Sequence, residues 1–244
     1  MAENQLTFNR IEKKFLVPAE IFPEFFAELR EHLVPDQNPK YTINNLYFDT
    51  PDYAMIRKSI ESPVYKEKLR LRWYGNGSPD DAAFLEIKKK YKGIVYKRRE
   101  NLTNEDISKI LASPLSYEMP KDTQIWREIT YLRDYWKPIP MTYIAYDREA
   151  FAGKEDKELR ITFDRNLRYR KDNLNTSDYS SSPIMDGSNI LMEIKFPGTS
   201  PLWLARLLSK YEIRQSSFSK YGTCYKNFLI ADFKDKYLGG NKNV

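Results

Sequence analysis

Charged and apolar side chains alternate in most segments of strand character, and this alternation constrains the fold more than any other feature of the chain. In the segment 66–73, lysine and arginine occupy one set of alternate positions, and leucine and tryptophan occupy most of the other. The segments 10–15, 85–88, 158–164 and 192–196 repeat the pattern with mixed charges. Because successive side chains of a strand point to opposite faces, each segment has one apolar and one densely charged face. Repeated along the chain with an excess of cations, the pattern predicts a closed sheet around a basic, water-filled lumen.

The order of the predicted elements gives the fold class. Eight segments are expected to be strands: 7–17, 42–50, 64–74, 81–91, 93–101, 141–151, 157–165 and 189–197. Helices are expected at 18–33, 104–112, 122–136, from 200 onward and at 216–231, with a surface loop at 170–189. Strands in hairpin order with inserted helices predict an α+β protein: an eight-stranded antiparallel β-barrel tunnel with a polar, basic lumen and peripheral helices. We expect one domain over residues 1–244, with a frayed tail at 232–244.

Composition limits the partners and the chemistry. A net charge of +6 and a pI near 9.1 favour polyanionic partners, namely nucleic acid, nucleotides, polyphosphate or an acidic membrane surface. With Cys224 as its one cysteine, the chain cannot form an intramolecular disulfide. With His32 as its one histidine, in a predicted helix, a histidine-based zinc site or a Ser-His-Asp triad is not expected. No apolar run is long enough to span a bilayer and no signal peptide is recognisable, so we expect a cytoplasmic protein.

The predicted lumen needs an anion. Its cations outnumber its carboxylates, and such an excess would destabilise the fold unless anions compensate it. The cations are Arg10, Lys14, Lys66, Lys68, Arg70, Arg72, Lys88, Lys97, Arg99, Arg148, Arg160 and Lys195; the carboxylates are Glu12, Glu86, Glu158, Asp164 and Glu193. No glycine-rich phosphate loop is present, so side chains would have to hold any phosphates. Two other interpretations stay open: a solvated outer face of an open sheet, and RNA binding, although no RRM aromatic pair or KH loop is present.

An ordered set of short motifs resembles a known family. The motifs are RIEKKF (10–15), YFDTPD (47–52), KLRLRWY (68–74), FLEIK (84–88), KRR (97–99), YDREAF (146–151), LRITFD (159–164), LMEIK (191–195) and FSKY (218–221). Together they resemble the polyphosphate polymerase domain of the vacuolar transporter chaperone family, in its compact bacterial form. That domain belongs to the triphosphate tunnel metalloenzymes, which are CYTH-like proteins with an eight-stranded antiparallel tunnel. The resemblance covers nearly the whole chain.

The resemblance implies a function and a set of site residues. It implies a polyphosphate polymerase that transfers the γ-phosphoryl group of ATP to a growing polyphosphate chain, with Mn²⁺ or Mg²⁺ held by Glu193. The residues expected to act directly on the phosphates are Lys14, Arg70, Arg72, Arg148, Arg160 and Lys220. Further substrate contacts are expected from Arg10, Lys88, Lys97, Arg99 and Lys195. Among these, the four arginines Arg70, Arg72, Arg148 and Arg160 would clamp the triphosphate, and Lys14 and Lys220 would orient the acceptor. Glu86 is expected to orient Lys88 or Arg72 and not to bind metal. The expected partners are ATP and inorganic polyphosphate, no nucleic acid is expected, and a membrane-protein partner is possible in principle but not visible in the sequence.

Two departures from the family pattern keep alternatives open. The tunnel triphosphatases begin with Glu-x-Glu-x-Lys, and Arg10 replaces the first glutamate here. This replacement favours the polymerase over a triphosphatase that hydrolyses triphosphate or nucleotides. The polymerase pattern also has a lysine where this chain has Ser217. The missing cation favours a non-catalytic polyphosphate- or nucleotide-binding module.

Overall fold

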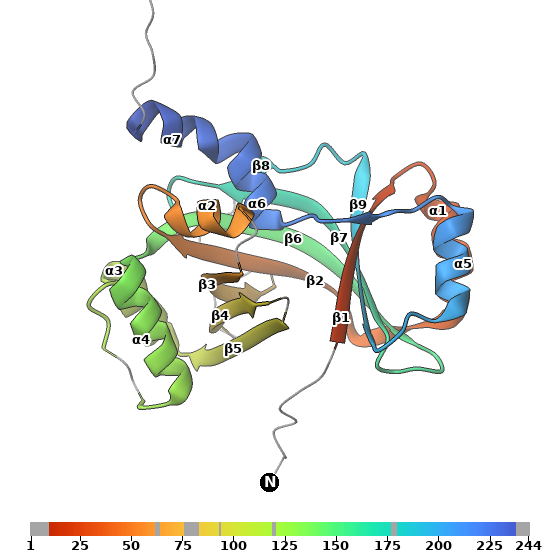
Figure 1. Ribbon diagram of the computed structural model, residues 1–244, viewed down its shortest axis with the longest axis horizontal. Helices are drawn as coiled ribbons and strands as arrows, with labels where there is room; N and C mark the ends of the chain where they lie inside the picture. Colours follow the sequence, from red (N-terminus) through yellow and green to blue (C-terminus); the bar gives the residue numbers. More distant parts are fainter. Residues whose placement is uncertain are drawn as a thin grey trace, which may run out of the picture. The chain divides into compact units, whose positions relative to one another are not determined.

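The chain divides into two compact units, each with its own apolar core. The computed structural model describes residues 10–61, 64–75, 83–92, 94–118, 121–176 and 180–237, and the statements below concern these residues. Unit 1 consists of Met1–Tyr41, Tyr146–Leu167 and Met185–Phe218. Unit 2 consists of Thr42–Ala145, Arg168–Ile184 and Ser219–Val244. Figure 1 shows the elements of both units.

The described strands form one sheet of ten strands, which differ in length. They are β1 (Arg10–Pro18), β2 (Leu33–Asp49), β3 (Tyr65–Tyr74), β4 (Ala83–Tyr91), β5 (Ile94–Leu102), β6 (Ile139–Gly153), β7 (Arg160–Arg170), β8 (Ser182–Pro183), β9 (Asn189–Pro197) and β10 (Gln215–Ser216). The pairing order is β10-β1-β9-β7-β6-β2-β3-β4-β5, with β8 on β7. The pairs with a described register are antiparallel, so the predicted α+β class is confirmed.

The sequence predicted a closed barrel of eight strands, but the described strand pairing forms an open sheet. The order has two ends, β10 and β5, and the described residues contain no pairing that joins them. The eight predicted strands all form, but the two-residue strands β8 and β10 are additional. Such short strands lack a hydrophobic period and therefore leave no pattern in the sequence.

Helices and turns connect the strands. They are α1 (Phe22–Leu29), the 3₁₀ turn η1 (Arg30–His32), α2 (Ala54–Ile60), α3 (Asn104–Ala112), α4 (Gln124–Trp136), α5 (Leu202–Lys210), α6 (Lys220–Cys224), the π-helical turn η2 (Tyr225–Leu229) and α7 (Ile230–Tyr237). No helix in the described part of the chain is both long and apolar enough to cross a membrane.

The core of unit 1 forms between the apolar faces of β1, β7 and β9 and the helices α1 and α5. Phe15 and Val17 alternate on β1, and Ile161 and Phe163 alternate on β7, as the period of two predicts. Phe25 of α1 is fully buried among them. Each large apolar side chain buried in this way stabilises the fold by about 1.5–3 kcal/mol.

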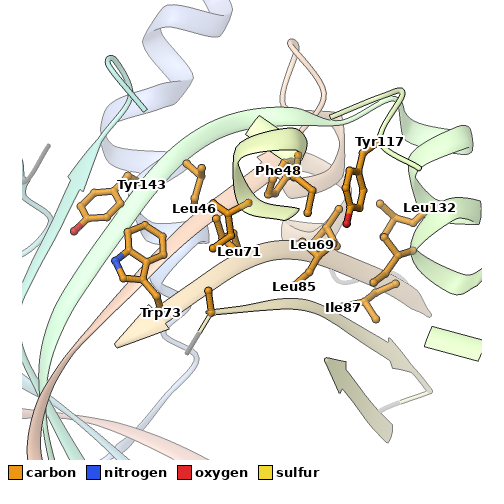
Figure 2. Packing of buried hydrophobic residues seen from close by; sticks show 14 of the residues in the cluster. Leu46, Phe48, Leu69, Leu71, Trp73, Leu85, Ile87, Tyr117, Leu132 and Tyr143 are labelled. Atoms are coloured by element: carbon orange, nitrogen blue, oxygen red, sulfur yellow. The ribbon is translucent and has the colours of Figure 1, made fainter. Parts of the chain in front are cut away.

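The core of unit 2 forms on one face of β2, β3 and β4, beneath α3 and α4. Leu69, Leu71 and Trp73 of β3 are buried on this face (Figure 2). Helix α4 contributes Leu132, and Tyr117 lies in the segment between α3 and α4. The apolar face of the period-two pattern is therefore the core face, which leaves the charged side chains on the opposite face of the same strands.

Several strands differ from their predicted ranges: β6 covers Ile139–Gly153 instead of 141–151, and β7 covers Arg160–Arg170 instead of 157–165. Strand β1 continues to Pro18, opposite Asn189, and α1 begins only at Phe22 instead of at Pro18. Strand β2 begins at Leu33 instead of 42, although Pro35 and Pro39 lie in it. The described pairing with β3 starts at Ile43, so the prolines occupy a stretch that needs no hydrogen bonds to β3.

Helix α2 is absent from the prediction, which places a strand and a turn at 47–52. Its first turn is capped by side chains that precede it: Thr50 Oγ1 accepts from the backbone N–H of Ala54 at 2.7 Å. The predicted last helix is present but interrupted, since it consists of α6, η2 and α7. Helix α7 reaches Tyr237, beyond the predicted start of the tail at 232; residues 238–244 lie outside the described part.

Trp73, Trp126, His32 and Cys224 were predicted to have packing or surface roles and no part in the chemistry, and their positions agree with this. Trp73 and Trp126 are buried in the unit 2 core. His32 is exposed and stacks on Trp203 at 4.1 Å between ring centroids. Cys224 is fully buried on α6, and burial raises the pKa of its thiol to about 12, so the thiol is neutral and unreactive at neutral pH.

Candidate functional site

Cations form rows across the strands of unit 2. Directly opposed residues of antiparallel strands share a face, and the register places Lys68, Lys88 and Lys97 opposite one another on β3, β4 and β5. The adjacent row is Arg70, Glu86 and Arg99. Like charges directly opposite one another destabilise a sheet. On this face of β3–β5, the described residues include Glu86 as the one carboxylate, so the face is suited to a polyanion.

Glu86 joins three of the predicted phosphate-binding residues. Its Oε2 accepts from Arg70 Nε at 2.8 Å and Nη2 at 2.6 Å, and lies 3.7 Å from Arg72 Nε. Its Oε1 lies 2.8 Å from Lys97 Nζ. The Glu86 side chain is 1% exposed. The prediction that this carboxylate orients cations is confirmed for Arg72; the structure adds Arg70 and Lys97 as partners.

The charge cluster shifts the pKa values of its members. Burial alone would raise the pKa of Glu86, but Arg70, Arg72 and Lys97 outweigh it and hold the pKa at about 2. Desolvation lowers the pKa of Lys97 to about 8, assisted by Arg72 and opposed by Glu86. Glu86 is therefore an ion at any physiological pH, whereas Lys97 is the member of the cluster that can lose its charge in mildly basic solution.

The arginines of the cluster are also held from β2. Arg72 Nε donates to Asn45 Oδ1 at 2.9 Å, and Arg70 Nη1 donates to the Tyr47 hydroxyl at 3.1 Å. Asn45 in turn donates to the backbone carbonyl of Ile144 at 3.0 Å. These contacts fix each guanidinium group from one side and fit the preorganisation that phosphate binding requires.

Asp49 anchors the helix that carries Lys220. Tyr221, the residue after Lys220, donates its hydroxyl to Asp49 Oδ2 at 2.9 Å. Its ring stacks on Tyr47, with centroids 4.6 Å apart and planes at 16°. Because Tyr47 also accepts from Arg70, Asp49 links Lys220 to the arginine cluster through two aromatic rings.

Backbone donors complete the environment of Asp49. Its Oδ1 accepts from the N–H groups of Thr50 at 2.8 Å and Met55 at 2.9 Å, and its Oδ2 accepts from Ile56 at 3.0 Å. Burial raises the pKa of Asp49 to about 6 in spite of these donors and of Tyr221. The carboxylate therefore both caps α2 and holds α6.

Replacing Tyr221 with phenylalanine is expected to destabilise the protein by about 1.5–3 kcal/mol, because a hydrogen bond to a buried charged group is lost. The pKa of Asp49 should rise further, since one of the groups that lower it is removed. Chemical denaturation at pH 7 measures the first effect, and calorimetric titration with tripolyphosphate measures whether Lys220 loses its position. Tyr96→Phe, on an exposed tyrosine, is the control. Equal stability of Tyr221→Phe and Tyr96→Phe would contradict the anchoring role.

A second ionic cluster lies in unit 1. Arg148 donates through Nε and Nη2 to the two carboxylate oxygens of Asp164, at 2.6 and 2.8 Å, and through Nη2 to Glu193 Oε2 at 3.3 Å. Lys14 Nζ lies 3.6 Å from Glu193 Oε1 and 3.6 Å from Glu12 Oε1. Lys195 Nζ lies 3.8 Å from Glu12 Oε2, at the edge of the cluster. Three predicted site residues, Lys14, Arg148 and Lys195, thus share this network.

The carboxylates of this cluster do not fit a metal centre held by the protein. Both oxygens of Glu193 are engaged by cations, and both oxygens of Asp164 are engaged by Arg148. In the part of the chain that the structure describes, no three His, Cys, Asp or Glu side chains come together as metal ligands. Glu193 acts here as an ion-pair partner, so we derive no catalytic step through a protein-held ion.

The side chains of several predicted site residues make their described contacts outside both clusters, although the register places Arg99 opposite Glu86 and Arg160 opposite Lys195. Arg160 pairs with Asp36 and has no described contact with Arg148 or Glu193. Arg99 lies over the ring of Phe84 at 4.4 Å. For Arg10 the structure gives the backbone pairing with Pro197 but not the side chain. Glu158, predicted to line the lumen, is exposed and precedes β7, which begins at residue 160.

The sequence analysis missed Asp49 and Tyr47 as members of the site. Both belong to the motif at 47–52, which resembled the family but was interpreted only as the end of a strand. The available signal was an aspartate followed by threonine just before an apolar run, which is a helix-capping pattern. The anchoring of Lys220 through Tyr221 left no sequence signal, because these residues are separated by more than one hundred and fifty positions from Asp49.

Two solved structures of known proteins share the fold of this chain. A protein from Hippeastrum, described as a candidate adenylyl cyclase with a dominant triphosphatase activity, is 16% identical, with a TM-score of 0.54 over 89% of this chain and 95% of that chain. A candidate adenylate cyclase from Bacillus halodurans is 15% identical, with a TM-score of 0.54 over 90% of this chain and 97% of that chain. At this level of identity the likeness shows a shared fold.

Sequence comparison gives the family. No curated protein sequence matches the chain. The family model described as the VTC domain matches residues 9–229, which include every motif on which the resemblance was based. The chain therefore belongs to the VTC domain family.

Proposed function

We propose that this protein is a phosphoryl-transfer enzyme that extends inorganic polyphosphate with the γ-phosphoryl group of ATP. One observation carries the proposal: the row of Lys68, Lys88 and Lys97 next to Arg70 and Arg72, with Glu86 as the carboxylate among them. These cations occupy the face opposite the apolar core, on strands that pack firmly on their other side. A phosphate chain supplies repeated negative charge that would relieve the repulsion within the row.

Positioning and charge are what the reaction demands of the protein. Phosphoryl transfer proceeds through a loose transition state and needs little covalent help, but it needs the donor and acceptor in line. Arg70 and Arg72, each held by Glu86 and by a side chain of β2, are suited to grip the phosphoryl oxygens with their guanidinium forks. Lys220 would orient the acceptor. The predicted contributions of Lys14, Arg148, Arg160, Arg10, Arg99 and Lys195 to the grip on phosphates stay predictions.

Hydrolysis of triphosphate is the second candidate. It is supported by the fold shared with the Hippeastrum protein, whose dominant activity is that of a triphosphatase. Arg10 in place of the first glutamate of the triphosphatase pattern argues against it. A non-catalytic module that binds polyphosphate is the third candidate, and Ser217 in place of a lysine favours it.

One incubation separates the three candidates. Pure protein is mixed with ATP in the presence of Mn²⁺, of Mg²⁺ or of a chelator, and ADP, free phosphate and acid-stable polymer are followed together. We expect polymer to appear in step with ADP. Free phosphate without polymer would instead establish the triphosphatase, and binding of polyphosphate without either product would establish the binding module. The chelator arm shows whether an ion carried by the nucleotide is required.

We expect the affinity for tripolyphosphate to fall between pH 7 and pH 9. Lys97, with a pKa lowered to about 8, loses its charge in this range, whereas the arginines keep theirs. A bound polyanion should also raise the pKa of Lys97, so binding at pH 8 should take up protons from the buffer.

Calorimetry in buffers of different ionisation enthalpy measures both effects. Lys97→Arg is the matched variant, because arginine keeps its charge and should make binding independent of pH in this range. An identical fall of affinity in wild type and Lys97→Arg would assign the dependence to another group.

A further inference from the structure

A cavity of about 230 Å³ lies in unit 2 beside the cation rows, and its lining includes Lys66, which precedes Lys68 on the same face of β3 and was predicted to line the lumen. It is lined by the start of β3, by α2 and by the last turns of α4. Residues 65–67 at the start of β3 pair with β4 on one side. On the other side, the described pairing with β2 ends at Phe48 opposite Leu69 and does not reach these residues. The cavity lies beside this unpaired edge of β3.

The floor of the cavity is a fixed aromatic surface. Glu67, which is buried, accepts from Trp136 Nε1 at 2.7 Å through one carboxylate oxygen and from the Tyr65 hydroxyl at 2.6 Å through the other. Both oxygens of Glu67 and both aromatic donors are thereby used within the protein. What Tyr65 and Trp136 present to the cavity is ring surface, held in one orientation.

Two tyrosines extend this aromatic surface into solvent. Tyr131 and Tyr135 lie one turn apart on α4, are 67% and 63% exposed, and line the cavity. Their rings are nearly parallel, at 10°, with centroids 6.4 Å apart. Exposed aromatic side chains that gather beside a cavity are typical of ligand sites, since single exposed apolar residues usually lie scattered.

Two lysines make the cavity positive. Lys58 Nζ lies 5.3 Å above the Trp136 ring, and Lys66 Nζ donates to the backbone carbonyl of Ser59 at 3.2 Å. Neither has a described ion pair with a carboxylate, and Lys90, opposite Lys66 on β4, adds a further positive charge. Glu67 is the one carboxylate among the lining residues, so the two lysines leave the lining with a net positive charge, which disfavours the cationic ligands that aromatic surfaces often bind. The cavity is suited to a planar ring joined to an anion.

We propose that this cavity is a second ligand site, which binds a nucleoside monophosphate with its base stacked on Tyr131 and Tyr135 and its phosphate on Lys58 and Lys66. The proposal goes beyond the proposed function, because the site neither includes the arginine cluster nor requires turnover. It would make the protein responsive to nucleotides that carry no transferable phosphoryl group.

Calorimetric titration with AMP, adenosine and ribose 5-phosphate tests the proposal. We expect AMP to bind, and adenosine and ribose 5-phosphate to bind at least tenfold more weakly, because each lacks one of the two recognised parts. The double variant Tyr131→Ala/Tyr135→Ala should lower AMP affinity about tenfold, which is the range of base–aromatic stacking. Its affinity for tripolyphosphate should be unchanged. Tyr96→Ala, at an exposed tyrosine of β5 that does not line the cavity, is the matched control.

Two further measurements exclude misfolding of the variants and binding of AMP at the cation rows as explanations. Lys58→Gln should lower the affinity for AMP but not the affinity for adenosine. Photocrosslinking with 8-azido-AMP should label α4 in the wild type and lose the label in the double variant. Unchanged AMP affinity in the double variant, equal binding of ribose 5-phosphate and AMP, or labelling of β4 and β5 in place of α4 would each overturn the proposal.

Discussion

Arg70→Ala is expected to lower the rate of ATP turnover by a factor of about 10²–10³, the usual loss when one preorganised donor to a developing negative charge is removed. Arg70 is the member of the arginine cluster with the most complete support, because Glu86 binds two of its nitrogens and Tyr47 binds a third. That support leaves little freedom to the guanidinium group before substrate arrives. Its removal should therefore affect the rate constant of transfer more than the affinity for nucleotide.

Steady-state kinetics with ATP, with kcat and KM determined separately, measures this effect. Arg70→Lys keeps the charge but loses the fork, and we expect it to recover only a small part of the activity. Arg127→Ala is the matched control, since Arg127 pairs with Asp122 on the exposed side of α4. A loss of less than fivefold in Arg70→Ala, or an equal loss in Arg127→Ala, would remove Arg70 from the reaction.

Glu86→Gln is expected to destabilise the protein by about 3–5 kcal/mol, the range for removing one partner of a buried ionic cluster. The amide keeps the shape of the side chain but no longer neutralises Arg70, Arg72 and Lys97. Denaturant unfolding at pH 7 measures the difference. Glu105→Gln, whose exposed carboxylate pairs with Lys109, should change stability by less than about 0.5 kcal/mol.

The pH dependence of this difference has a definite sign. The pKa of Glu86 is lowered from 4.5 to about 2 in the folded protein, so its contribution to stability is present above about pH 4.5 and is lost as the pH falls toward 2. The stabilities of wild type and Glu86→Gln should therefore converge in acid. Convergence at pH 7 instead would mean that the charge of Glu86 does not stabilise the fold.

Polyanion should reverse part of the defect. Tripolyphosphate supplies the negative charge that Glu86→Gln lacks, so it should raise the melting temperature of the variant more than that of the wild type. A smaller rise in the variant would show that Glu86 shapes the anion site and does more than neutralise it. The two outcomes separate a positioning role from a purely electrostatic one.

The sequence predicted the strands and their faces well, because a period of two is a local property. Leu69, Leu71 and Trp73 are buried where the pattern places them, and Arg70 and Arg72 lie on the other face. The antiparallel α+β class follows from the same pattern. At the centre of the charged face Arg72 and Glu86 are buried, whereas Lys97 and Arg99 on β5 are exposed, and the closed lumen that the pattern predicted is not formed by the described pairing.

The parts that could not be predicted depend on contacts distant in sequence. Helix α2 forms because Asp49 and Thr50 cap it, and seven residues without a clear apolar stripe gave no helical period. Strand β2 begins at Leu33 although Pro35 and Pro39 disfavour a strand there. Both prolines precede Ile43, where the described pairing with β3 begins, and this could be known only from the register. Glu193 was expected to hold a metal, but in the structure it pairs with Lys14 and Arg148. These partners lie on β1 and β6, and the pairing of β1 with β9 that brings Lys14 opposite Glu193 is not visible in the sequence.

The rows of cations on β3–β5 have a consequence for how a long anion would move. Neighbouring strands lie about 4.8 Å apart and alternate residues of a strand about 6.4–6.8 Å apart, and the register sets Lys68, Lys88 and Lys97 side by side in one row. A polymer with a regularly repeated charge would meet three cations in succession along this row. It can exchange one cation for the next while the other contacts persist, so that it slides without dissociating. A surface of this kind retains long chains more firmly than short ones and still lets the bound chain advance.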